Sequence, residues 1–261
     1  MAISPDPSRS ALPARPQREA SCPEHGAYTS VNVIGGVWSR CPACESAARK
    51  REEDAAVLER LKAQEVHHRA MLDAARIPAR FERCSFDNFV VTTDDQRHAL
   101  TVCRDFVENF DEHARRGAVL ILSGKPGTGK SHLAGAILRE LIYREVRYTT
   151  CLDMIRAIRQ TWRRDARHSE PELLAYFERL DLLVIDEVGM QYGTDGEQTI
   201  VFDVLDRRYR ELKPTILLTN QGKEGFRAHM GERTYDRLRE TSRWVTFNWP
   251  SYRPTARKEA A

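Results

Sequence analysis

Residues 124–131 form a glycine-rich octapeptide that fits the pattern G-x-x-x-x-G-K-S/T at every position. Glycines let successive backbone N–H groups turn inward around anionic oxygens, and a helix that begins here adds the positive end of its dipole. Lys130 is long enough to reach β- and γ-phosphates, and the Ser131 hydroxyl can ligate Mg²⁺. The pattern therefore predicts a site for ATP and Mg²⁺. Its residues are Gly124, Lys125, Pro126, Gly127, Thr128, Gly129, Lys130 and Ser131.

Two adjacent carboxylates, Asp186 and Glu187, follow the apolar stretch 182–185. We expect Asp186 to hold the Mg²⁺ shell and Glu187 to orient or deprotonate an attacking water, which favours hydrolysis over phosphoryl transfer to a metabolite. Capping of the next helix is the alternative role for this acid pair. Asn220 follows another apolar stretch, 216–219, and could contact the γ-phosphate or the water. A turn-forming asparagine is the alternative there.

A second cluster could bind metal. Cys22-x2-His25 and Cys41-x2-Cys44 are separated by fifteen residues, a spacing that suits a tetrahedral Zn²⁺ site with no open position for catalysis. The alternative is a coincidence of free thiols. The segment 28–38 between the pairs predicts a small hairpin that turns at residues 35–36.

The segment 152–164 predicts a helix rich in arginine. Guanidinium groups neutralise phosphates and an aromatic ring stacks on a base, so this helix could bind single-stranded DNA. The candidate contacts are Arg156, Arg159, Trp162 and Arg163. The alternative is an ordinary amphipathic helix with Met154, Ile155 and Ile158 inside, and with Trp162 in the core.

These residues need elements that bring them together. From residue 81 onward strands and helices alternate, which predicts an α/β fold with a parallel sheet and helices on both faces. The expected strands are 118–123, 147–151, 181–185, 215–219 and 244–247, and the expected helices are 131–143, 152–164, 171–180 and 197–212. The acid pair and Asn220 would then lie at the carboxyl edge of the sheet beside the phosphate loop, where ligands bind in such sheets.

The chain organisation follows from composition. We expect a disordered Pro/Ser/Arg-rich tail (1–20), a zinc-binding module (21–45), a helical linker (46–78), the nucleotide-binding domain (79–255) and a short tail (256–261). The linker has apolar residues spaced for one helical face, and Pro78 ends its pattern. These residues are Ala55, Leu58, Leu61, Val66 and Met71.

Composition excludes several classes of protein. The 261 residues are 41% hydrophobic and 30% charged, with 41 Lys+Arg against 38 Asp+Glu, for a net charge of +3. No apolar run is long enough to span a membrane, and the first twenty residues lack an apolar signal-peptide core. Six cysteines are too few for a disulfide scaffold. Composition therefore predicts a cytoplasmic protein without membrane partners.

Several longer segments resemble one family. They are Cys84-Ser85-Phe86-Asp87-Asn88-Phe89, the loop around Lys130, the stretch 181–189, the segment GERTYDRLR at 231–239 and the segment WVTFNWPSYR at 244–253. Together these resemble the DnaC-type helicase loaders, which are AAA+ ATPases, and the related IstB-type transposition helper ATPases. The resemblance covers residues 80–255. The last two segments are the most particular to the loaders.

The resemblance implies a mechanism. In the family, an arginine at the position of Arg237 enters the neighbouring subunit's ATP site, so that the chain self-associates on ATP binding; Arg233 and Arg239 are rivals for this role. Arg253 matches the sensor arginine that contacts nucleotide. Only eight residues follow Arg253, so no full C-terminal lid is expected. The implied partners are single-stranded DNA and a hexameric replicative helicase, which the zinc module would hold.

Three other functions stay open on the sequence. The same ATPase domain could act with a transposase, as in the IstB-type helpers. The chain could be a P-loop kinase for a small molecule, in which Glu187 is not a hydrolytic base. It could also be a zinc-dependent DNA-binding adaptor whose nucleotide site does not turn over.

Overall fold

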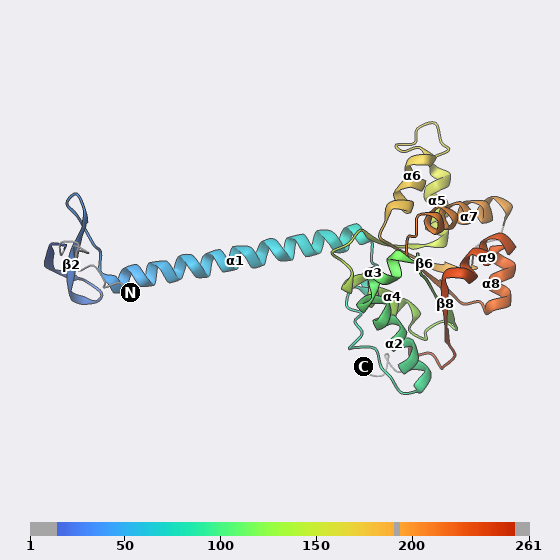
Figure 1. The fold of residues 1–261 in the computed structure, drawn as a ribbon, viewed down its shortest axis with the longest axis horizontal. Helices are drawn as coiled ribbons and strands as arrows, with labels where there is room; N and C mark the ends of the chain where they lie inside the picture. Colours follow the sequence, from blue (N-terminus) through green and yellow to red (C-terminus); the bar gives the residue numbers. More distant parts are fainter. Residues whose placement is uncertain (1–14, 191–193, 254–261) are drawn as a thin grey trace, which may run out of the picture. The chain divides into compact units, whose positions relative to one another are not determined.

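The computed structural model describes residues 15–190 and 194–253, and the chain divides into two units, residues 1–66 and 67–261. Figure 1 shows the elements of both units. Within the described residues, no helix is both long enough and apolar enough to cross a bilayer.

The first unit contains a small antiparallel sheet. Among its described residues, β1 (Gln17–Cys22), β2 (Gly26–Ile34) and β3 (Val37–Trp38) pair in the order β1-β2-β3. The predicted hairpin with its turn at residues 35–36 is confirmed as β2–β3. The assignment of residues 17–20 to a disordered tail is wrong, because they pair with residues 28–31 of β2. The rest of that tail, up to residue 14, lies outside the described residues.

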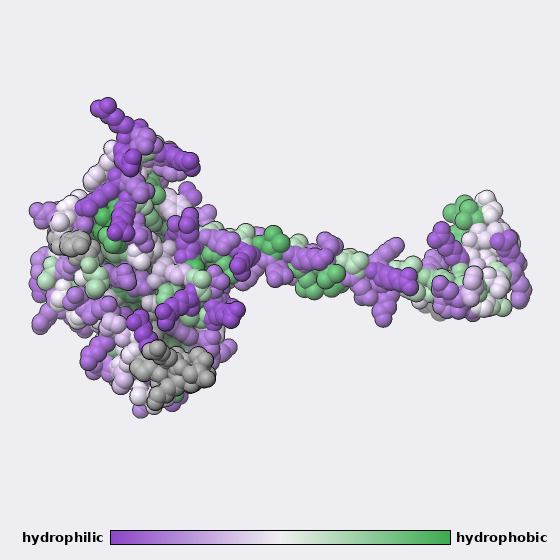
Figure 2. Space-filling view, turned by 180° about the vertical axis from the view of Figure 1, so that it is seen from behind, coloured by the Kyte–Doolittle hydropathy of each residue, from purple (hydrophilic) through white to green (hydrophobic). Residues whose placement is uncertain are grey.

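A 34-residue helix, α1 (Pro42–Ala75), follows the sheet. It begins earlier than the predicted linker because a proline is well suited to the first helical position. Of its described residues, only Ala75 is buried. The predicted apolar face therefore faces solvent except at Met71, which packs against the core of the second unit. Apolar side chains are visible along the helix surface in Figure 2. Its large exposed members are Leu58, Leu61 and Val66.

The second unit is built on a parallel sheet, as predicted. Its described strands are β4 (Val119–Gly124), β5 (Val146–Thr150), β6 (Leu182–Val188), β7 (Thr215–Thr219) and β8 (Ser242–Phe247). They pair in the order β5-β6-β7-β4-β8, with every pairing parallel. Successive residues of β4 point to opposite faces, and each face is buried in its own apolar cluster.

Helices cover both faces of this sheet (Figure 1). On one face lie α2 (Asp94–Glu108), α3 (Phe110–Arg115) and α4 (Lys130–Glu140), with the 3-10 turn η1 (Ala79–Phe81) against α4. On the other face lie α5 (Cys151–Gln160), α6 (Glu170–Arg179), α7 (Asp195–Arg210), α8 (Lys223–Met230) and α9 (Glu232–Thr241). The strand–helix alternation did not predict α2, α3, α8 or α9. A capping box marks the start of α2, formed by Thr93 and Gln96, and could have revealed it.

Candidate functional site: a nucleotide pocket and a Cys/His cluster

The predicted phosphate loop connects β4 to α4, as its chemistry requires. Two of its glycines are needed for space as well as for conformation. Gly124 has φ +150°, and a Cβ there would lie 2.2 Å from the carbonyl oxygen of Phe247. Gly129 has φ +97°, and a Cβ there would lie 2.7 Å from the Phe89 ring. The loop is therefore packed between β8 and the segment 84–89, and a side chain at either glycine would displace it.

Lys130 lies at the start of α4, and only 7% of its surface is exposed. Its Nζ donates hydrogen bonds to the carbonyl oxygens of Gly124, at 2.6 Å, and Lys125, at 2.9 Å. Burial lowers the pKa of Lys130 to about 8, against the opposing attraction of Asp186 and with a small contribution from Arg253. A phosphate beside this ammonium group would stabilise its charged form, so nucleotide binding and protonation of Lys130 are linked.

An open cavity of about 860 Å³ lies in front of the loop, within the size range of small-molecule sites. Its lining includes nine of the predicted site residues from four parts of the chain, which are Pro126, Gly127, Gly129, Lys130, Ser131, Asp186, Glu187, Asn220 and Arg253. The sheet order explains this meeting. Strand β7 lies between β4 and β6, so Asn220 emerges between the phosphate loop and the acid pair.

The acid pair lies near the end of β6, where the backbone departs from regular strand geometry. The pairing of β6 with β7 shifts between Ile185 and Val188, and Glu187 has φ +59°. This left-handed conformation is uncommon for a non-glycine residue, and it sets the exposed Glu187 beside the pocket. The alternative role of the pair as a helix cap is wrong, because Thr194 caps the next helix, α7.

Ser131 and Asp186 are placed to hold Mg²⁺. Ser131 Oγ donates to Asp186 Oδ2 at 3.0 Å. Adjacent ligands of an octahedral Mg²⁺ with bonds of 2.0–2.1 Å lie about 2.9 Å apart, so these two oxygens fit neighbouring positions of such a shell. Both are hard oxygen donors of the kind that Mg²⁺ prefers.

Sequence reasoning missed several residues of the pocket. The lining also contains Arg80, Phe81, Cys84, His132 and Tyr252. Tyr148, from β5, donates a hydrogen bond to Asp186 Oδ2. Burial and the neighbouring carboxylate raise the pKa of Tyr148, so the phenol stays protonated. Strand alternation places Tyr148 on one face of β5, but no local spacing links it to an acid 38 residues away.

The C-terminal segment 244–253 reaches the phosphate loop. The Trp249 indole N–H donates to the carbonyl oxygen of Thr128 at 2.9 Å, and the Tyr252 backbone N–H donates to that of Gly127 at 2.9 Å. These bonds explain how Arg253, the predicted sensor, comes to line the cavity.

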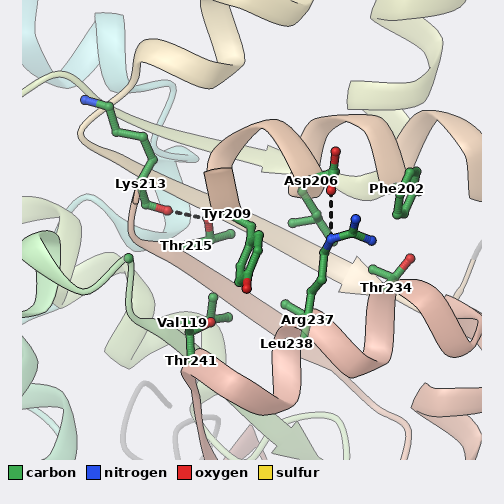
Figure 3. A pocket seen from close by; sticks show the side chains of 12 residues that line it. Val119, Phe202, Asp206, Tyr209, Lys213, Thr215, Thr234, Arg237, Leu238 and Thr241 are labelled. Carbon is green, nitrogen blue, oxygen red and sulfur yellow. Dashed lines mark hydrogen bonds and ion pairs between the residues drawn. The ribbon is translucent and has the colours of Figure 1, made fainter. Parts of the chain in front are cut away.

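Arg237 lies elsewhere. Among the described residues that line the nucleotide cavity, Arg237 does not occur. It projects from α9 toward α7, where its Nε lies 2.8 Å from Asp206 Oδ1 (Figure 3). Its guanidinium carbon lies 5.1 Å from the Phe202 ring centre and 6.0 Å from that of Tyr209. The guanidinium carbon of its rival Arg233 lies 5.4 Å from the Phe202 ring centre.

The predicted DNA-binding helix is shorter than expected. Helix α5 ends at Gln160, so Trp162 and Arg163 lie in the turn that follows it. After Gln160 the backbone N–H groups of residues 161–163 bond to carbonyls three positions back, and the Thr161 hydroxyl also donates to the Ile158 carbonyl at 2.6 Å. The inward face predicted for an amphipathic helix is confirmed, since Met154, Ile155 and Ile158 are buried.

Each DNA-contact candidate has an acidic neighbour. Arg156 lies 3.8 Å from Asp153, Arg159 lies 3.4 Å from the buried Glu197, and Arg163 lies 3.1 Å from Asp165. The Trp162 indole donates to Glu170 at 2.7 Å, and its side chain is 57% exposed. The alternative that places Trp162 in the core is therefore wrong.

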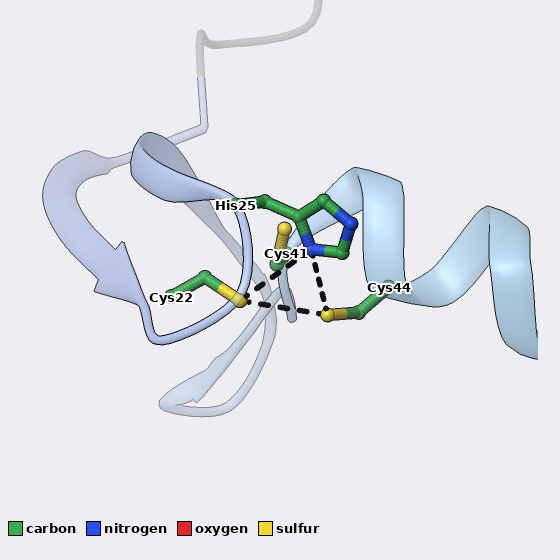
Figure 4. A group of neighbouring side chains, drawn as sticks. All are labelled: Cys22, His25, Cys41 and Cys44. Carbon is green, nitrogen blue, oxygen red and sulfur yellow. Dashed lines mark hydrogen bonds between the residues drawn. The ribbon is translucent and has the colours of Figure 1, made fainter.

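The four predicted metal ligands converge in the first unit (Figure 4). One ligand atom from each of Cys22, His25, Cys41 and Cys44 lies within 4.8 Å of all the others. Cys22 Sγ lies 3.5 Å from Cys44 Sγ, and His25 Nδ1 lies 3.3 Å from Cys44 Sγ and 3.7 Å from Cys22 Sγ. Zn–S bonds of about 2.3 Å and Zn–N bonds of about 2.0 Å in a tetrahedron put ligand atoms about 3.5–3.8 Å apart, so the cluster fits zinc.

The protonation of this cluster also suits a cation. Hydrogen bonding to His25 lowers the pKa of Cys22 to about 6, whereas the nearby Cys22 sulfur raises the pKa of Cys44 to about 12. The two pKa values shift in opposite directions because two thiolates at this distance would repel each other. A divalent cation among them would stabilise both as thiolates. The remaining cysteines, Cys84, Cys103 and Cys151, are buried and free.

Comparison with known proteins adds to this geometry. Residues 48–260 match the family described as "IstB-like ATP binding protein". The chain belongs to the IstB-like ATP-binding family. The AAA+ fold and the DnaC/IstB resemblance predicted from the motifs are thereby confirmed.

Individual relatives are similar to this chain over about two thirds of its length. The "Replicative helicase loader DnaC" of Escherichia coli strain K12 is 43% identical over 175 residues, which are 66% of this chain and 70% of the relative. The "Uncharacterized protein YdaV" of the same strain is 35% identical over 187 residues, which are 70% of this chain and 73% of the relative.

Two solved structures share the fold. A crystal structure of the DnaC helicase loader superposes with a TM-score of 0.58 at 23% identity, covering 65% of this chain and 99% of that one. The AMPPCP-bound DnaA of Aquifex aeolicus gives a TM-score of 0.57 at 21% identity, covering 71% of this chain and 56% of that one. Both likenesses concern the α/β fold of an AAA+ domain.

Proposed function

We propose that this chain is an ATP-driven loader that places a hexameric replicative DNA helicase on single-stranded DNA. The observation that carries the proposal is the 43% identity with a replicative helicase loader, which extends over two thirds of this chain. The assembled pocket supports the ATP-driven part, because phosphate-binding, Mg²⁺-ligating and water-activating groups meet at one edge of the sheet.

Hydrolysis would use residues of this pocket in distinct roles. The loop N–H groups and Lys130 bind the phosphates, while Ser131 and Asp186 hold Mg²⁺, which offsets charge on the phosphoryl oxygens. Glu187 projects beside the pocket without a capping role, and it orients and deprotonates water. Asn220 lies between Lys130 and Glu187, where its amide contacts the γ-phosphate or that water.

Arg237 would act on the ATP of a neighbouring subunit. Two observations support this. Its guanidinium is outside the nucleotide cavity of its own chain, and its side chain keeps 34% of its surface exposed. The pair with Asp206 and the contact with Phe202 fix its direction from α9. An arginine supplied in trans makes ATP binding promote self-association and makes hydrolysis depend on assembly.

Single-stranded DNA would bind at the end of α5 and the turn after it. The exposed ring of Trp162 is available to stack on a base, and the exposed Arg156 and Arg163 can exchange their weak surface ion pairs for phosphates. Arg159 contributes least, because its partner Glu197 is buried and would be left without a counter-charge.

The first unit would bind zinc and hold the helicase. Zinc would give this small sheet its shape, and the sheet presents apolar side chains to solvent at its hairpin. Ile34 is 77% exposed and Val37 is 65% exposed. Such residues are typical of a protein contact rather than of nucleic-acid binding, where positive charge dominates.

A transposition helper is the second candidate, and the match of residues 48–260 to the IstB-like family favours it specifically. Capture experiments separate the two. Immobilised full-length protein with ATP should retain a purified replicative helicase from the same organism and not a transposase. Retention of the transposase alone would reject the loader.

Measurements of ATP hydrolysis distinguish the remaining candidate functions. Single-stranded DNA should stimulate phosphate release, and Arg237→Ala should abolish the stimulated rate while ATP binding is retained. Arg239→Ala, a rival for this role two residues away on the same helix, should keep the stimulated rate. Loss of the stimulated rate in Arg239→Ala but not in Arg237→Ala would assign the role to Arg239. Phosphate transfer that requires an added acceptor would indicate a kinase, and ATP binding without turnover would indicate an adaptor.

A further inference from the structure

The carboxylate of Asp186 accepts hydrogen bonds from three donors, and one donor has no part in the chemistry above. Ser131 Oγ donates to Oδ2 at 3.0 Å, and the backbone N–H of Glu187 donates to Oδ1 at 2.6 Å. The third donor is the Tyr148 hydroxyl, which also bonds Oδ2. Tyr148 and Ser131 therefore share one oxygen, the one that faces the phosphate loop.

The fold fixes the direction of the Tyr148 hydroxyl. Tyr148 lies in the middle of β5, where the strand pairs Tyr148 with Val184 and Thr150 with Asp186. Its side chain is 6% exposed, and its ring lies 6.1 Å from the ring of Phe81, which lines the nucleotide cavity. A ring buried between the sheet and Phe81 cannot swing its hydroxyl into water, so the bond to Asp186 is preorganised.

We propose that Tyr148 is a positioning residue that orients Asp186 toward Mg²⁺. The inference rests on the proposed ATP chemistry. When Ser131 turns its oxygen lone pairs to the metal, its own hydrogen bond to Asp186 is weakened. Tyr148 then remains the side-chain donor that holds the carboxylate in place. Charge-assisted O–H···O⁻ bonds are among the stronger hydrogen bonds, and partners that orient a metal ligand typically contribute 10- to 100-fold to metal affinity.

Tyr148→Phe tests this role, because it removes the hydroxyl and keeps the ring. Affinity for a fluorescent ATP analogue is measured in EDTA and then across a Mg²⁺ titration, with the full chain. We expect the affinity in EDTA to change by less than about twofold, and the Mg²⁺ concentration for half-maximal gain to rise about tenfold or more. Tyr143→Phe is the control, since this tyrosine is 64% exposed and should leave the titration unchanged.

Two results would overturn the inference. One is a Mg²⁺ midpoint in Tyr148→Phe equal to that of the wild type. The other is an equal loss of affinity in EDTA and in Mg²⁺, because that pattern belongs to a packing role. A Ser131→Ala, Tyr148→Phe double-mutant cycle supplies an independent check: donors that share one oxygen should give non-additive losses, and additive losses count against the inference.

Failure of the proposed function is recognised separately. If the affinity of the wild type for the analogue did not respond to Mg²⁺, the proposed ATP chemistry would fall before any variant was compared, and the role of Tyr148 with it.

Discussion

The two units of this chain are stabilised in different ways. In the second unit, both faces of a parallel sheet are buried under helices, and two apolar clusters fill the space between. In the first unit, the buried residues within 15–66 are only Cys22, Ser30 and Cys41, and two of these are candidate metal ligands. The first unit therefore has almost no apolar core, and we expect ligand chemistry to replace it.

The two units also differ in how much core their proposed functions require. A nucleotide site needs groups held rigidly at the end of a sheet, and the large core provides that rigidity. A surface that only has to present an exposed hairpin needs little core, provided that its ends are tied together. Cys22 at the end of β1 and Cys44 in the first turn of α1 lie 22 residues apart and meet at the cluster.

Removal of zinc should give the largest effect. Structural zinc contributes on the order of 10–16 kcal/mol to small domains, so chelation or Cys41→Ser should unfold β1–β3. The second unit should keep its ATP affinity. Metal analysis of the purified protein should find about one zinc per chain for a four-ligand site. Amide exchange, followed by mass spectrometry, should show fast exchange in residues 17–38 only.

An unchanged exchange pattern in residues 17–38 after complete metal removal would contradict this view of the first unit. Cys103→Ser is the matched control, because this buried cysteine lies in the core of the second unit. It should leave the zinc content unchanged.

Truncation in the sheet core should have the converse effect. Leu217 on β7 is fully buried, and Leu217→Ala should lower the free energy of unfolding of the second unit by about 2–5 kcal/mol. Leu58→Ala on α1 is the control, since that side chain is 52% exposed and its loss should cost well under about 1 kcal/mol. Denaturant titration measures both. Equal losses of unfolding free energy in the two variants would mean that Leu58 is buried against another surface in solution.

The pH dependence of nucleotide affinity should isolate Lys130. Burial lowers the pKa of this lysine to about 8 in the nucleotide-free protein, and a bound phosphate should raise it again. Between these two pKa values the complex holds one more proton, so affinity should fall as pH rises above about 8, approaching tenfold per unit.

Lys130→Arg provides the control, because a guanidinium stays charged throughout this range. Whatever the affinity of this variant for ATP at pH 7, its affinity should not change between pH 8 and pH 9. A wild-type affinity that is equally flat would contradict the linkage between nucleotide binding and Lys130 protonation.

Surface charge on α1 should matter least. Arg49 and Glu53 form an i,i+4 pair at 3.0 Å, with both side chains more than half exposed. Arg49→Ala should change stability by about 0.3–0.5 kcal/mol at most, and less in high salt. Thermal unfolding at two ionic strengths measures this. A larger change would show that α1 takes part in a contact beyond its own helix.

Much of the nucleotide site could be predicted because its chemistry uses short spacings. The phosphate loop is contiguous, and the acid pair directly follows an apolar strand. The Cys/His ligands also come as two close pairs, so their convergence needed only one hairpin. Local patterns failed where a distant partner decided the outcome. Residues 17–20 look like a tail until β2 pairs with them.

The sequence by itself determined the α/β class, the phosphate loop, the acid pair and the metal-ligand set, because residue type and local spacing are sufficient for these features. Only the tertiary structure decided that Tyr148 bonds Asp186 and that Arg237 pairs with Asp206 outside its own pocket. Both contacts join residues about 30 or more positions apart. They depend on the strand order and on which helices share a sheet face, and these arrangements are set by burial of the whole core rather than by any one segment.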